Sequence, residues 1–130
     1  MKLVVDTNIY CDYAEGLPHA VDAMVAYGEE IYLPSVVIGE LMYGFIRGKK
    51  QDFNERMLRR FIRVLKVDVI DITADVARKY GMIFVGLRKK GAKIPTNDVW
   101  IAACCMEVGG TLLTRDRHFR YVEQIETMIV

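Results

Sequence analysis

A chain of 130 residues with 52% apolar side chains is long enough for one domain around its own core. The net charge of +1 and this apolar content exclude an intrinsically disordered chain, which would be more polar and further from neutrality. No apolar run approaches the roughly 18 residues that a membrane-spanning helix needs, and Asp6 interrupts the N-terminal run too early for a signal peptide. We therefore expect a soluble, cytoplasmic protein with a single domain over residues 1–130.

Short apolar runs alternate with amphipathic segments along the chain. The runs are the predicted strands, at residues 3–5, 31–33, 67–72, 111–114 and 125–130. The segments between them are the predicted helices, from about residue 9 and then at 18–26, 35–48, 53–65, 74–90 and 97–108. Strands that alternate with helices predict an α/β protein built on a parallel sheet.

Particular side chains indicate where some of these helices begin and end. Ser35 and Thr73 can each accept a hydrogen bond from the first turn of the following helix, so both are predicted N-caps. Gly81 and Gly86 are expected to interrupt the helix after Thr73. Residues 115–120 are expected to form a loop before the last strand.

The three cysteines favour a reducing compartment. Cys11 stands alone, whereas Cys104 and Cys105 are adjacent within an apolar run. An odd number of cysteines without a C-x-x-C pair is typical of neither a disulfide framework nor a zinc site. We expect buried, reduced thiols.

Two aspartates follow predicted strands at the place where each strand ends. Asp6 comes directly after the first strand, and Asp116 comes two residues after the fourth. Ligand sites of open parallel sheets lie beyond the carboxyl ends of the strands, so both side chains could meet there. Ordinary turn chemistry explains Asp6 equally well, and an aspartate between two arginines usually just pairs with them. Position alone leaves both interpretations of Asp6 open and favours ordinary pairing for Asp116.

Asp98 is the acid whose position is hardest to explain without a function. At helical spacing it shares a face with Ile101, Ala102 and Cys105, while Glu107 lies on the opposite face. The helix dipole favours an aspartate in the first turn, but it does not explain an aspartate on the apolar face. A carboxylate there is unfavourable unless something pairs with it, which favours a functional role.

Glu40 has the weakest claim from the pattern alone. It lies off the apolar stripe of its predicted helix, on the face of Val36, Tyr43 and Arg47. Helical periodicity therefore predicts an ordinary solvated acid.

If the four acids converge, their charges restrict the chemistry. Two carboxylates about 4 Å apart repel each other by about 4 kcal/mol at an effective dielectric of about 20. Several together require protonation or a cation among them. No histidine or cysteine is expected in this cluster, and ligation by oxygen alone suits Mg²⁺ or Mn²⁺, not zinc. Such a site can activate water and neutralise charge on a phosphodiester.

Four segments together resemble one known family. They are LVVDTN at the N-terminus, LPSVVIGELMYG around Glu40, GAKIPTNDVWIAA around Asp98 and LLTRDRHF around Asp116. This pattern, which runs from residue 3 to about residue 119, resembles PIN-domain ribonucleases, and the short chain is similar to VapC-type toxins of toxin–antitoxin pairs. The resemblance implies an α/β/α sandwich with a central parallel sheet of four to five strands.

The resemblance also implies roles for individual residues. An acidic quartet would hold one or two Mg²⁺ or Mn²⁺ ions and cut RNA to leave a 5′-phosphate and a 3′-hydroxyl: Asp6, Glu40, Asp98 and Asp116. Other positions would support these acids or lie beside them: Thr7, Thr114, Asn97, Ser35 and, as a basic position ahead of the third acid, Arg88.

The family implies partners as well. VapC-type proteins form homodimers and bind a VapB-type antitoxin tail through the region that here holds Tyr43, Phe45 and Phe53, although core packing explains these rings too. Arg115 and Arg117 flank Asp116 and are favoured for RNA phosphate contact.

The remaining charged residues have open or ordinary interpretations. The basic residues between 47 and 66 could bind RNA or could form a solvated helix face. His19 and His118 are interpreted as isolated structural or surface residues, and His118 could touch RNA.

Other functions stay open from the sequence. A phosphatase also places aspartates at strand ends, but Asp6-Thr7-Asn8 lacks the second aspartate that such an enzyme needs. A housekeeping RNA-processing nuclease of the same family would carry the same acids. A non-enzymatic metal- or protein-binding module would not need the intact quartet.

Overall fold

A five-stranded parallel sheet forms the centre of the molecule in the computed structural model, which describes residues 1–130. Its strands are β1 (Lys2–Val5), β2 (Glu30–Pro34), β3 (Asp68–Ile70), β4 (Thr111–Thr114) and β5 (Glu126–Ile129). They lie in the order β3-β2-β1-β4-β5, and every neighbouring pair is parallel. The prediction of a parallel α/β sheet is confirmed.

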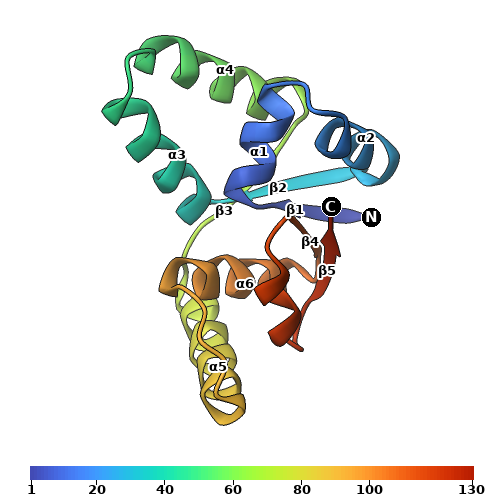
Figure 1. Cartoon of the computed structure of the whole chain (residues 1–130), viewed down its shortest axis with the longest axis vertical. Helices are drawn as coiled ribbons and strands as arrows, with labels where there is room; N and C mark the ends of the chain where they lie inside the picture. Colours follow the sequence, from blue (N-terminus) through green and yellow to red (C-terminus); the bar gives the residue numbers. More distant parts are fainter.

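Helices cover both faces of this sheet. They are α1 (Thr7–Ala14), α2 (Pro18–Tyr27), α3 (Ser35–Arg47), α4 (Gln51–Val64), α5 (Ala74–Lys90) and α6 (Thr96–Val108), followed by the 3₁₀ helix η1 (Arg117–Tyr121). In Figure 1, α1 and α2 lie on one side of the sheet, and α6 lies on the other with α5 packed against it. The α3–α4 hairpin extends beside α1. The predicted α/β/α sandwich is therefore confirmed.

The apolar runs form the core because the central strands are covered on both faces. Leu3, Val4 and Val5 are fully buried, and they belong to one contiguous cluster of 29 buried residues.

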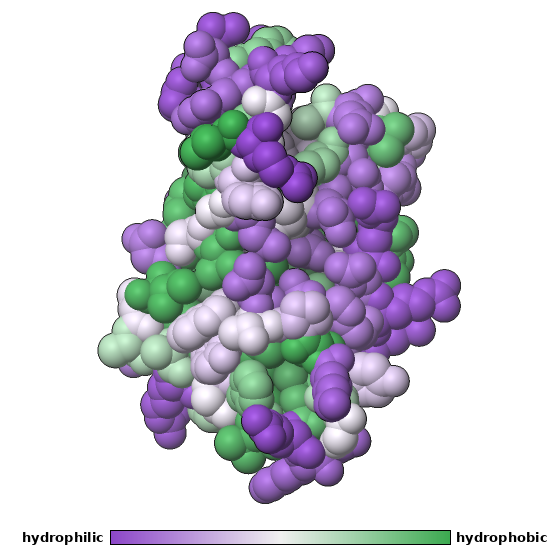
Figure 2. Space-filling view, turned by 60° about the vertical axis from the view of Figure 1, so that its left-hand side comes forward, coloured by the Kyte–Doolittle hydropathy of each residue, from purple (hydrophilic) through white to green (hydrophobic).

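Hydrophilic side chains cover the end of the molecule where α3 meets α4 (Figure 2). None of the helices has the length and apolar character needed to cross a bilayer.

The predicted limits of α5 are confirmed by its caps. The Thr73 hydroxyl accepts a hydrogen bond from the Val76 amide at 3.2 Å, and Gly91 ends the helix in the left-handed conformation at φ 68°. The expected interruption at Gly81 and Gly86 is wrong, since α5 runs through both. Packing against α6 outweighs the low helix propensity of glycine.

Three local predictions are wrong. Ser35 is not a cap, because β2 runs directly into α3 and Pro34 takes the capping position without a side-chain hydrogen bond. The expected loop at 115–120 contains η1. Cys11 is exposed, whereas burial raises the pKa of the Cys104 and Cys105 thiols to about 11 and about 12.

The strand order changes direction at the centre of the sheet, between β1 and β4. From β1 the chain moves outward to β2 and β3, and then it returns to the other side of β1 to form β4 and β5. The connections therefore diverge between β1 and β4, and this is where parallel sheets bind ligands beyond their carboxyl ends. Asp6 and Asp116 follow these two strands.

Candidate active site

Asp6 is buried at the junction of β1 and α1. Its Oδ1 atom accepts a hydrogen bond from the Thr7 amide at 2.8 Å, which caps the helix, and its Oδ2 atom accepts one from the Thr114 hydroxyl at 2.6 Å. Burial raises the pKa of Asp6, and so do the charges of Asp116 and Glu40, while the two hydrogen bonds lower it. Asp6 is thus a carboxylate held by two hydrogen bonds, and its burial and charged neighbours favour the binding of a proton or a cation.

Thr114 connects this carboxylate to the next acid. Its hydroxyl oxygen also accepts a hydrogen bond from the Asp116 amide at 3.0 Å. The Thr114 side chain is fully buried, and it therefore holds the end of β4 against the end of β1.

Replacing Thr114 with valine is expected to weaken both the fold and the site. The buried Asp6 oxygen and the Asp116 amide would each lose a partner, which costs roughly 1–3 kcal/mol of unfolding free energy. Loss of a group that orients a metal ligand should lower Mn²⁺ affinity roughly 10–100-fold, measured by titration calorimetry. Thr111→Val at the other end of β4 is the matched control, and unchanged Mn²⁺ affinity in Thr114→Val would contradict the expected role.

Asp98 lies in the first turn of α6, and its side chain lines the same cleft as Asp6. Ile101, Ala102 and Cys105, which were expected to share its helix face, are all fully buried. Burial first, and then the charge of Asp6, raise the pKa of the Asp98 carboxyl from 3.8 to about 6. The predicted orientation of Asp98 towards the protein interior is confirmed.

His118 accompanies the acids, contrary to expectation. Its Nε2 atom lies 2.8 Å from Asp98 Oδ2, so the interpretation of this histidine as isolated is wrong. Ligand atoms of Asp98, Asp116 and His118 all lie within 4.8 Å of one another, close enough to share a metal ion. The η1 turn begins directly after Asp116 and brings His118 back towards α6. The sequence predicted only a loop here, so it did not indicate where the His118 side chain would lie.

Glu40 joins the cluster from α3. The Thr7 hydroxyl donates a hydrogen bond to Glu40 Oε1 at 2.8 Å, which ties α3 to the start of α1. Helical periodicity predicted a solvated acid because it separates the core-facing side of a helix from every other side. It cannot distinguish a face that lines a cleft from a face that meets bulk water.

These side chains line one polar cleft of about 500 Å³. Pro95 is its one residue without a polar side chain, and the complete lining is Asp6, Thr7, Asn8, Glu40, Pro95, Thr96, Asn97, Asp98 and Asp116. Asn97 is where it was expected, whereas Ser35 is not part of the lining. Four carboxylates in one cleft repel one another, and a divalent cation with oxygen ligands relieves that repulsion. The cleft therefore fits a metal ion.

The arginines that were expected to bind RNA lie outside this cleft. Arg115 Nε forms an ion pair with Asp12 Oδ2 at 3.0 Å, and His19 Nε2 lies 2.7 Å from the same oxygen. Arg88 is stacked over an aromatic ring of α5, and Arg117 is exposed. His19 is therefore not isolated, and Asp12, which is buried, is the partner that the sequence did not reveal.

Comparison with known families agrees with this geometry. The family model for the PIN domain matches residues 3–125. Because this match spans almost the whole chain, the chain belongs to the PIN-domain family.

Its relatives within that family include VapC ribonucleases. Ribonuclease VapC2 of Rickettsia felis is 31% identical to this chain over an alignment of 121 positions, which covers 89% of this chain and 87% of that protein. Ribonuclease VapC4 of Mycobacterium tuberculosis is 24% identical, and the match covers 79% of each protein. The expected resemblance to VapC-type proteins is confirmed.

Solved structures share the fold. A chain in the crystal structure of VapBC2 from Rickettsia felis, bound to a DNA fragment from their promoter, superimposes with a TM-score of 0.86 at 27% identity and 98% coverage of both chains. DNA-bound VapBC from Salmonella typhimurium gives a TM-score of 0.85 at 22% identity, covering 98% of this chain and 97% of that one.

Proposed function

We propose that this protein is a metal-dependent endoribonuclease and the toxin of a type II toxin–antitoxin pair. The observation that carries the proposal is the polar cleft, where Asp6, Glu40, Asp98 and Asp116 converge at the centre of a PIN-family sheet. Its relatives are named ribonucleases, and RNA is therefore the proposed substrate. We propose further that residues 1–130 form one domain that works in the cytoplasm, where its RNA substrate is found.

The proposed metal is Mg²⁺ or Mn²⁺, held by the four carboxylates. When bound, it would lower the pKa of a water molecule and neutralise charge on the phosphodiester. His118 is a further candidate ligand, and a nitrogen ligand would favour Mn²⁺ over Mg²⁺.

The other residues of the cleft would orient these groups. Thr114 and Thr7 fix Asp6 and Glu40 through the hydrogen bonds at 2.6 and 2.8 Å, so these carboxylates need little rearrangement to bind a cation. Asn97 lines the cleft with a neutral amide that could donate a hydrogen bond to a phosphate oxygen.

Activity against two substrates tests the proposed reaction. The purified chain should cleave single-stranded RNA with Mg²⁺ or Mn²⁺ and should leave a generic phosphate monoester intact. Turnover of the monoester without RNA cleavage would favour the phosphatase alternative.

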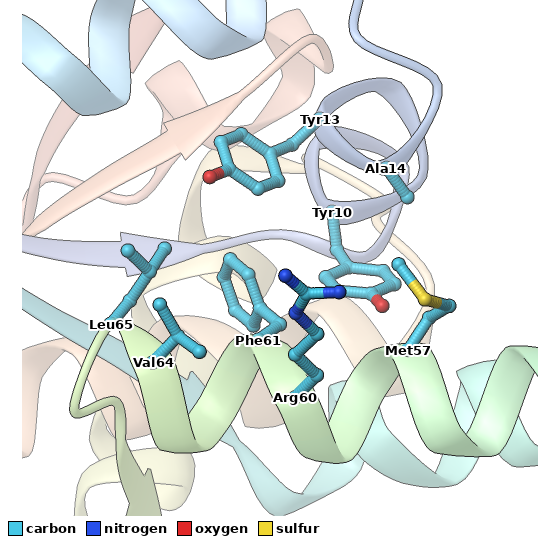
Figure 3. A pocket seen from close by; sticks show the side chains of 8 residues that line it. All are labelled: Tyr10, Tyr13, Ala14, Met57, Arg60, Phe61, Val64 and Leu65. Carbon is cyan, nitrogen blue, oxygen red and sulfur yellow. The ribbon is translucent and has the colours of Figure 1, made fainter.

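An apolar pocket between α1 and α4 supports the proposal of an antitoxin partner. Of its eight lining residues only Arg60 is not apolar or aromatic, and the pocket volume is about 280 Å³. Figure 3 shows Tyr10, Tyr13 and Ala14 extending from α1, while the other side chains come from α4 and its C-terminal end. Phe61 contacts both tyrosines, with its ring centroid 5.0 Å from that of Tyr10 and 5.3 Å from that of Tyr13.

A tail of a VapB-type antitoxin is the proposed occupant of this pocket, whose lining includes none of Tyr43, Phe45 and Phe53, where the tail was expected. Solved structures that share the fold are VapBC complexes, and apolar anchors of an extended or helical segment suit such a groove. The match to VapC ribonucleases and to VapBC structures favours the toxin over a housekeeping nuclease. A homodimer is also proposed, and exposed Met82 and Val85 on α5 would supply apolar surface for it.

Replacing Met57 with glutamate is expected to prevent inhibition by the antitoxin while RNA cleavage continues. Met57 lines the pocket and is 39% exposed, so a charge there blocks apolar docking without disturbing the core. The measurement is RNA cleavage with increasing antitoxin. Val25→Glu, at an 80% exposed position on α2, is the control and should remain inhibited. Full inhibition of Met57→Glu would place the antitoxin elsewhere.

A further inference from the structure

The acidic cleft continues along α3. A second concave region of about 530 Å³ shares Thr7, Glu40 and Asn97 with the cleft, and Tyr43 and Arg47 form its far side. Because three lining residues are common to both, a ligand that leaves the acidic cleft past Glu40 arrives directly at Tyr43.

Tyr43 and Arg47 form an exposed pair on this path. Tyr43 is 65% exposed, and the Arg47 guanidinium carbon lies 5.1 Å from the centroid of its ring. Glu40, Tyr43 and Arg47 recur at the spacing that places them on one helix face. Gly39 and Gly44 line the same region without side chains, so the approach to the ring is open. The result is a flat aromatic and cationic platform beside the acids.

Positive charge follows the platform at the end of α3. The α3–α4 turn and the start of α4 form another concave surface, which carries Lys49, Lys50 and Arg56 together with one acid, Asp52. This turn belongs to the hydrophilic end of the molecule in Figure 2. A chain of phosphates with one phosphate in the acidic cleft would therefore meet an aromatic ring and then a cluster of cations.

We infer that Tyr43 and Arg47 form a stacking subsite for an unpaired RNA nucleotide next to the cleaved phosphate, with Lys49 and Lys50 contacting the backbone beyond it. Unpaired bases stack on aromatic rings and on guanidinium planes, whereas bases within a duplex are not available to do so. The inference rests on the proposed ribonuclease function, and it specifies a single-stranded substrate.

Binding of a labelled single-stranded RNA tests the subsite. The full chain carrying Asp98→Asn serves as the parent, so that the RNA stays intact during fluorescence anisotropy measurements with Mg²⁺. Adding Tyr43→Ala should weaken binding about tenfold, and Tyr43→Phe should change it less than about twofold because the ring remains. Arg47→Ala should weaken binding and also reduce its salt dependence. Tyr27→Ala is the matched control, because Tyr27 is 47% exposed at the end of α2, and it should not change the RNA affinity.

The outcomes separate the subsite from the catalytic function. In the chain with Asp98 intact, Tyr43→Ala should raise KM about tenfold with kcat retained. A fully paired duplex of the same sequence should bind equally to the parent and to Tyr43→Ala. If the wild-type chain cleaves RNA but Tyr43→Ala binds single strands normally, the subsite is wrong and the ribonuclease stands. A change in oligomeric state without a change in RNA affinity would also overturn the subsite. Absence of RNA cleavage by the wild-type chain would contradict both the ribonuclease function and the subsite.

Discussion

Replacing Asp98 with asparagine should lower RNA cleavage about 100-fold or more while the fold stays intact. Changes to groups that only orient a metal ligand cost roughly 10–100-fold, and loss of a proposed ligand charge should cost at least the upper end of that range. Asparagine keeps the shape of the side chain and can still hydrogen-bond His118. The measurement is the initial rate of cleavage of a single-stranded RNA with Mg²⁺.

Glu107→Gln is the matched control for this variant. Glu107 lies on the opposite face of α6, where it pairs with Lys79 at 2.7 Å, and an exposed pair of this kind contributes little. The control should keep full activity. Full activity of Asp98→Asn with Mg²⁺ would contradict a catalytic role for Asp98.

The second large effect is a pH-dependent stability of the metal-free protein. Burial and the Asp6 charge raise the pKa of Asp98 from 3.8 to about 6, so the folded chain binds this proton more tightly than the unfolded chain. The stabilisation is complete below about pH 4 and is lost as the pH rises through about 6. The loss from this group should be on the order of 3 kcal/mol at pH 7.

Urea unfolding of the wild-type chain and of Asp98→Asn between pH 4 and pH 7, with chelator present, measures this effect. Other carboxylates titrate in both proteins, so the difference between the two curves reports Asp98 together with its coupling to Asp6 and His118. The wild-type chain should lose stability relative to the variant as the pH rises. Mn²⁺ at 100 times its Kd should return about 3 kcal/mol to the wild-type chain at pH 7. If the stabilities of the two proteins change in parallel with pH in the absence of metal, the pKa of Asp98 is not raised in the folded chain.

The sequence predicted the fold well because the fold depends on burial. Leu3-Val4-Val5 forms a strand covered on both faces, and such strands are recognisable as continuous apolar runs. Asp98 was identifiable for the same reason, since a carboxylate on a buried helix face contradicts the pattern around it. Asp6 and Asp116 were located by the rule that parallel strands end at one edge of a sheet.

The contacts that depend on tertiary geometry could not be predicted from one sequence. Glu40 faces a cleft that periodicity cannot distinguish from solvent, and family resemblance was its main support. His118 reaches Asp98 because of a 3₁₀ turn that apolar patterning does not indicate. Arg115 pairs with Asp12, a residue far away in the sequence, and its expected contact with RNA phosphate was based only on its position next to Asp116.

The ends produced on cellular RNA by the wild-type chain, mapped with Mg²⁺ and with a chelator, test the central claim most directly. A metal-dependent hydrolysis predicts cuts only with Mg²⁺, each leaving a 5′-phosphate and a 3′-hydroxyl. Equal cutting with the chelator, or ends carrying a 2′,3′-cyclic phosphate, would contradict metal-assisted hydrolysis by the acidic cleft.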